Sequence, residues 1–64
     1  MITITKLNDK QIVINCEQIE TVEANPDTTI TMNTGRKIIA RESVDEIVRK
    51  TIEFKKEIHG AHKQ

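Results

Sequence analysis

The sequence predicts a small α+β domain in which five short antiparallel strands precede one C-terminal amphipathic helix. Isoleucine and threonine alternate at residues 2–5 and again at residues 29–31, and a branched Cβ packs well on a pleated sheet. Turn-forming residue pairs separate the alternating stretches at regular intervals. A helix-capping sequence then opens a stretch whose apolar residues recur at helical spacing. We expect the strands to form a meander, either open or rolled into a small, partly open barrel.

The first two strands are expected over residues 1–7 and 11–16. The pair Asn8-Asp9 separates them and suits a turn, because both residues tolerate left-handed backbone. Alternation gives each strand an apolar face, made of Ile2 and Ile4 in the first strand and of Ile12, Ile14 and Cys16 in the second. Cys16 is therefore expected to be a small apolar residue of the core.

The third strand is expected over residues 19–24, with one irregularity. Ile19 and Val22 are three residues apart, so in a regular strand they point to opposite faces. A β-bulge would bring both side chains to one face, and a short helical turn is the other solution. Asn25 precedes Pro26, which biases it toward extended backbone and closes the strand.

A hairpin is expected over residues 26–41. Pro26-Asp27 suits the centre of a type I turn. Thr34-Gly35 can reverse the chain between the strands at 28–33 and 36–41, because glycine supplies the positive φ that hairpin turns need. The inward side chains of these strands are expected to be Ile30, Met32, Ile38 and Ala40.

The helix is expected from Val44 to about His59. Ser43 and Glu46 match a capping box, in which each side chain accepts a hydrogen bond from the backbone amide of the other. The core-facing side chains span roughly 160° at 100° per residue; they are Val44, Ile47, Val48, Ile52, Phe54 and Ile58. The opposite side carries the i,i+4 charge pairs Asp45–Arg49, Glu46–Lys50 and Arg49–Glu53. Gly60 is typical of a helix end, so residues 1–60 are expected to form one domain and residues 61–64 a frayed tail.

Composition argues against several functional classes. The 64 residues include ten basic and ten acidic side chains, and a neutral chain is a poor non-specific binder of nucleic acid. One cysteine cannot form an internal disulfide and fits a reducing compartment. The first residues do not match a signal peptide, and the longest apolar runs fall far short of the roughly 20 residues that cross a bilayer. We therefore expect a cytoplasmic protein that does not insert into a membrane.

No residue pattern points to an enzyme, a bound cofactor or a metal centre. His59 and His62 are three residues apart, but Gly60 lies between them and no other ligand is in register. The acidic residues Glu17, Glu20 and Glu23 are better explained as a solvated or partner-facing edge than as catalytic carboxylates. We expect a non-enzymatic protein without cofactor or metal.

Outward-facing polar side chains are the remaining candidates for contact with a partner. Thr3 and Thr5 would join Thr29 and Thr31 in one polar surface if the first and fourth strands expose the same face. The candidate contact residues are Thr29, Thr31, Arg36 and Lys37.

Three stretches together resemble the FlbD/SwrD family of small flagellar proteins. They are MITITKLND at residues 1–9, IETVEANPDTTITMNTGRKIIARESVDEIV at residues 19–48, and the charged amphipathic helix that completes the chain. Asp9 stands where the family usually has glycine. The resemblance implies a cytoplasmic accessory protein, peripheral to the flagellar base, that supports motility. It also implies contacts with motor or stator proteins that affect motor power, and no catalytic residue.

The order of elements is also similar to that of the carbon storage regulator family, whose members are dimers that bind RNA. The opening Ile4-Thr5-Lys6 is similar too, whereas the basic ends and the helix entry of that family are absent here. The alternative function is therefore that of a small dimeric RNA-binding post-transcriptional regulator. The shared architecture further implies a homodimer or higher oligomer.

Overall fold

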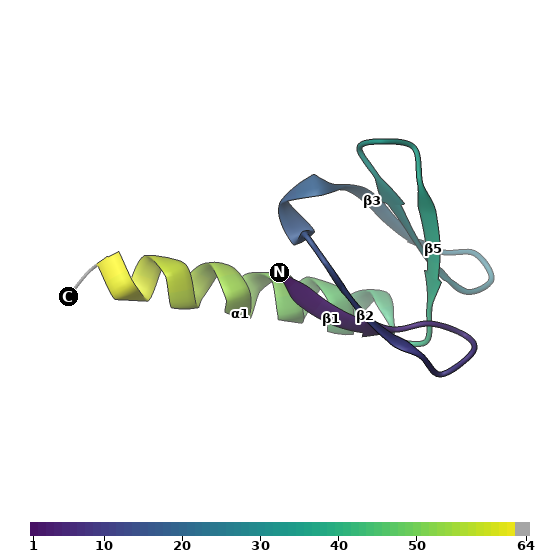
Figure 1. Ribbon diagram of the computed structural model, residues 1–64, viewed down its shortest axis with the longest axis horizontal. Helices are drawn as coiled ribbons and strands as arrows, with labels where there is room; N and C mark the ends of the chain where they lie inside the picture. The colour runs from purple at the N-terminus through teal and green to yellow at the C-terminus, as the bar shows by residue number, and fades with distance from the viewer. Residues whose placement is uncertain (63–64) are drawn as a thin grey trace.

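The computed structural model describes residues 1–62, with side chains described for residues 1–57. Its elements in chain order are β1 (Ile2–Thr5), β2 (Gln11–Ile14), the 3-10 helix η1 (Cys16–Gln18), β3 (Ile19–Ala24), β4 (Thr28–Met32), β5 (Lys37–Ala40) and α1 (Val44–His62). All strand pairs are antiparallel, and they form a two-stranded sheet, β1-β2, and a three-stranded sheet, β3-β4-β5. The predicted α+β class is confirmed, and in the described residues the strands stay open rather than closing into a barrel (Figure 1).

The two sheets meet where β1 and β5 end. Lys6 forms an isolated antiparallel bridge with Ala40, and the Arg41 amide donates a hydrogen bond of 2.8 Å to the Thr5 carbonyl. The helix contacts β1 and β3 and continues well beyond the strands toward the C-terminus (Figure 1). One short junction therefore holds both sheets and the start of the helix together.

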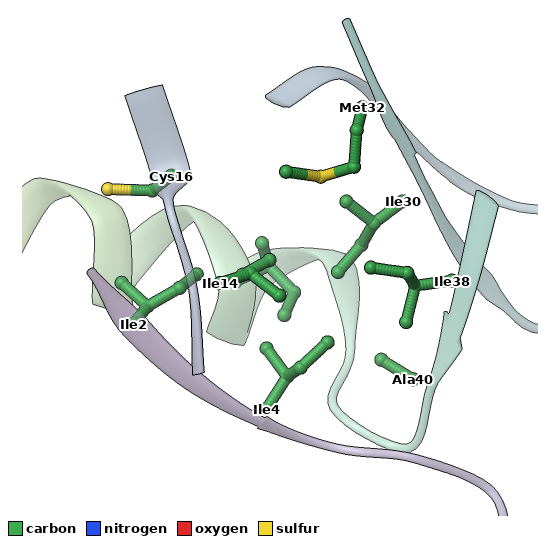
Figure 2. Packing of buried hydrophobic residues seen from close by; sticks show 9 residues of the cluster. Ile2, Ile4, Ile14, Cys16, Ile30, Met32, Ile38 and Ala40 are labelled. Carbon is green, nitrogen blue, oxygen red and sulfur yellow. The ribbon is translucent and has the colours of Figure 1, made fainter. Parts of the chain in front are cut away.

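The core lies between the two sheets and the first turns of the helix. Its buried apolar residues are Ile2, Ile4, Ile14, Cys16, Ile30, Met32, Ile38, Ala40 and Ile47. Figure 2 shows the labelled side chains of both sheets gathered in one cluster, with Cys16 of η1 at its margin. Ile4, Ile30 and Ile47 are the most completely buried residues. The two-stranded sheet, the three-stranded sheet and the helix thus each contribute one of them. The inward residues predicted for β1, β4 and β5 are confirmed, because alternation along a strand determines which face each side chain occupies.

The predicted turns and cap are largely confirmed. The Ser43 amide donates to Glu46 Oε1 over 3.0 Å, and the Glu46 amide donates to Ser43 Oγ over 3.1 Å, which completes the capping box. Gly35 has a φ of 91° in the β4–β5 turn, and Asp9 has a φ of 68° in the β1–β2 turn. Asp9 thus adopts the left-handed backbone that glycine tolerates best. The peptide bond Asn25–Pro26 is cis, which the expected type I turn does not include.

Of the two solutions left open for the third strand, the structure shows the register shift of a β-bulge. The register of β3 against β4 shifts between Ile19 and Thr21, so that Ile19 lies opposite Met32 and Val22 lies opposite Ile30. Both apolar side chains of β3 therefore reach the inner face. Cys16 is buried as expected, but it begins the 3-10 helix η1 rather than ending β2. The Asn15 side chain accepts a hydrogen bond of 3.0 Å from the Glu17 amide and caps this turn. This local hydrogen bond favours the turn over a continuation of β2.

The helix differs from its predicted form in three respects. Val48 and Ile52 are 46% and 49% exposed, because the small sheets cover only the side of α1 that carries Ile47 and Phe54. None of the three predicted i,i+4 charge pairs lies within 4.0 Å, although all their residues are described. Such pairs stabilise a helix by only about 0.2–0.5 kcal/mol, which side-chain entropy offsets.

The third difference is the end of the helix. Residues 60–62 continue α1, so the first part of the predicted tail is helical, and residues 63–64 lie outside the described part. A single glycine costs about 1 kcal/mol relative to alanine in a helix, and it does not end one by itself.

Candidate interaction surface

The face of the β3-β4-β5 sheet that points away from the core carries most of the predicted contact residues. Strand pairing aligns Thr21, Thr31 and Lys37 in one cross-strand row. It aligns Glu23, Thr29 and Ile39 in the next row. We call these six residues the outer face. Its three members on β4 and β5 that the sequence predicted, namely Thr29, Thr31 and Lys37, thus lie together.

A groove lies beside this face, between β5 and the tip of the β1–β2 hairpin. Its lining combines Lys6, Leu7 and Asn8 from the hairpin with the stretch Arg36–Ile39. Leu7 is 45% exposed and Ile39 is 43% exposed, so the groove has apolar side chains that no other part of the described chain covers. Arg36, the fourth predicted contact residue, lines the groove rather than the outer face. We call this the basic groove.

Arg41 holds the hairpin tip in place. Its Nη2 donates to the Leu7 carbonyl over 2.8 Å, and its Nε lies 2.7 Å from Asp9 Oδ1. The guanidinium plane has several donors in a rigid fork, so one side chain can bind both groups at once. Within the hairpin tip, the Asp9 amide donates to the Lys6 carbonyl, and the Lys10 amide donates to Asn8 Oδ1. These hydrogen bonds hold the loop that carries Leu7 in one conformation. The fold therefore keeps the Leu7 side chain exposed.

The charges of the surface are unevenly distributed. Lys6, Arg36 and Lys37 border the groove, and in residues 1–57 no carboxylate lies within 4.0 Å of any of them. Glu20 and Glu23 lie on β3, at the opposite edge of the three-stranded sheet. Along the three-stranded sheet the charge thus changes from basic at the β5 edge to acidic at the β3 edge. The basic groove presents positive charge around apolar side chains, a combination that suits a partner with acidic and apolar residues.

Glu42 lies at the junction of the two sheets and links it to β1. Its Oε1 and Oε2 both accept from the Thr5 amide, at 2.9 Å and 3.0 Å. Burial raises the pKa of the Glu42 carboxyl, but the hydrogen bonds from Thr5 and from its own amide, together with the charge of Lys50, outweigh burial and lower the pKa. The carboxylate therefore links the end of β1 to the segment between β5 and α1, and the ionised form is favoured.

We expect acid to weaken this link. Because the folded state lowers the pKa of Glu42, its contribution to stability is present above the ordinary pKa of glutamate and is lost as the pH falls through the folded value. Glu42→Gln should lower the free energy of unfolding by about 1 kcal/mol near neutral pH. Urea denaturation at about pH 7 and about pH 3 should show the difference between variant and wild type shrinking in acid. An equal difference at both pH values would contradict this role.

Within residues 1–57, the other candidate residues do not assemble into a site. Thr3 and Thr5 lie in the β1-β2 sheet, apart from Thr29 and Thr31 in β4. The three glutamates are exposed, and Glu17 Oε1 lies 3.7 Å from Lys55 Nζ. The side chains of His59 and His62 lie outside the described part, and in that part no three His, Cys, Asp or Glu side chains are grouped as metal ligands.

The sequence did not indicate Lys6, Leu7 or Ile39 as candidate contact residues. Ile39 was recognisable as an apolar residue on the same side of its strand as Lys37. Lys6 and Leu7 reach the groove only through the bridge between Lys6 and Ala40, a pairing of residues far apart in the chain. No local pattern indicates that contact.

The fold and this surface define a small α+β protein with an exposed apolar and basic region suited to contact with another molecule. None of the described helices has the length and apolar character needed to cross a membrane. A family model described as FlbD, flagellar and swarming motility proteins, matches residues 1–59. The chain belongs to this family, as the resemblance predicted, and the family places it in flagellar and swarming motility.

Two further comparisons give no additional relative. No curated protein and no solved structure matches the chain. Nothing in these comparisons supports the alternative of an RNA-binding regulator.

Proposed function

We propose that this protein is a cytoplasmic, non-enzymatic accessory protein of the flagellum that raises the power of the motor by contact with a motor or stator protein. The family match over residues 1–59 carries this proposal, because it identifies the process in which the chain takes part. The surface described above supports contact as the mode of action. A groove with three cations and two exposed apolar side chains can hold a protein segment of complementary charge.

The outer face and the basic groove are the proposed contact region. Thr29, Thr31 and Lys37 occupy the outer face, and Arg36 lines the groove beside it. Threonine hydroxyls lose little on desolvation when they find a partner, whereas Leu7 and Ile39 gain from being covered. The partner is expected to dock through acidic side chains opposite Lys6, Arg36 and Lys37.

Deletion of the gene tests the proposal at the level of the cell. We expect the deletion strain to assemble flagella in normal number and to swim more slowly than the wild type. Swimming speed should be measured by cell tracking, with flagella counted on the same cells. Expression of the wild-type gene from a second locus should restore the speed. Unchanged swimming and swarming in the deletion strain would refute the proposal.

A further inference from the structure

The side of α1 next to β3 carries a second exposed apolar region. Val48 and Ile52, which the sequence assigned to the core, are each about half exposed. Together with the half-buried Ile19 and Val22 they line a groove between the helix and β3. This groove shares no residue with the outer face or the basic groove.

Four residues form a continuous seam along this side of the helix. Asp45, Val48, Ile52 and Lys55 are spaced by three, four and three residues, the spacing at which side chains face a second helix in a coiled coil. All four are exposed. Asp45 and Lys55 are ten residues apart, which corresponds to about 15 Å along the axis. The apolar pair is thus flanked by an acid at one end and a base at the other.

This order of charges makes the seam complementary to itself. When two such helices lie antiparallel about a twofold axis at the level of Lys50, Val48 meets Ile52 of the other copy. Asp45 then meets Lys55 of the other copy at both ends of the contact. A parallel arrangement would instead place Asp45 beside Asp45 and Lys55 beside Lys55. The seam therefore favours one partner, a second copy of the chain, and one orientation.

We propose that the protein forms a homodimer in which the α1 seams pair antiparallel and each helix covers the groove between α1 and β3 of the other copy. Burial of Val48 and Ile52 would extend a core that comprises nine of the described residues in one copy. Domains of this size bury too little apolar surface to be robust alone, so covering the seam stabilises the fold as well. Lys55 already lies 3.7 Å from Glu17, an exposed pair that adds little in one copy.

Sedimentation equilibrium of the full chain tests the dimer. We expect wild type to sediment at twice the 7.3 kDa mass of one chain. Ile52→Glu should sediment as one chain, because it buries two carboxylates in the contact, while far-UV circular dichroism shows that the helix remains. Val13→Glu is the matched control, because Val13 is 64% exposed on β2, away from the seam. It should remain dimeric.

Charge exchange tests the orientation. Asp45→Lys alone and Lys55→Glu alone each place like charges together at both ends of the contact, and each should weaken the dimer about tenfold. The double variant restores opposite charges and should recover the wild-type dissociation constant. A 7.3 kDa species at all concentrations of folded wild type would overturn the proposal. So would a dimer that Ile52→Glu leaves intact, a double variant as weak as the singles, or a wild type that associates only with added lipid vesicles.

Discussion

Replacing Ile47 with alanine is expected to lower the free energy of unfolding by about 2–5 kcal/mol. Ile47 is 1% exposed and belongs to the buried cluster that both sheets share. Its removal takes away apolar surface and leaves a cavity that the surrounding strands cannot fill completely. Stabilities of natural domains are about 5–15 kcal/mol, so this loss would remove a large share of the total.

Urea denaturation followed by circular dichroism measures this effect, at one protein concentration for all variants because association changes apparent stability. Val13→Thr is the control, since it changes an exposed, β-branched residue on β2 and should alter stability by less than about 0.5 kcal/mol. Equal stabilities of Ile47→Ala and Val13→Thr would show that the helix does not pack on the sheets.

The second large effect is expected in the cell, from a double change in the proposed contact region. Lys37→Glu combined with Ile39→Asp reverses one charge of the basic groove and replaces one of its two exposed apolar side chains with a carboxylate. Neither side chain belongs to the core, so the protein should fold and accumulate normally. An acidic partner would then meet like charge, and swimming should fall to the speed of the deletion strain.

A matched control separates this effect from a general change in surface charge. Lys56→Glu with Val13→Asp makes the same two kinds of change at exposed positions on α1 and β2, away from the contact region. This variant should swim at wild-type speed. Equal swimming speeds for the two double variants, at equal protein levels, would contradict the assignment of the contact region.

Local patterns were enough to predict most elements of the fold. Alternation identified the inward residues of the strands, and the spacing of Ile19 and Val22 predicted an irregularity in β3, which the register shift shows. The capping box of Ser43 and Glu46 correctly predicted that the helix begins at Val44. These features depend on residues close together in the chain, where backbone geometry and side-chain hydrogen bonds determine the outcome.

The features that sequence did not predict depend on contacts between distant residues. Val48 and Ile52 have the periodicity of core residues, but how far the sheets extend over the helix determines whether they are covered. The sequence also did not predict that the strands form two sheets. The capped turn at Cys16–Gln18 separates β2 from β3, so these two strands do not pair.

The candidate surface shows the same division. The alternation of side chains along β4 and β5 was enough to place Thr29, Thr31 and Lys37 on one face of the sheet. Leu7 joins Ile39 only because Arg41 and the bridge between Lys6 and Ala40 bring the hairpin tip against β5. The sequence therefore indicated the part of the surface that lies on β4 and β5, but it did not indicate the part that the β1–β2 hairpin loop contributes.

The torque of single flagellar motors, measured from the rotation of tethered cells, tests the proposed function most directly. We expect the deletion strain and the Lys37→Glu/Ile39→Asp strain to have normal numbers of flagella that rotate with reduced torque. Wild-type torque in both strains, with the variant protein present at its normal level, would contradict a role in motor power.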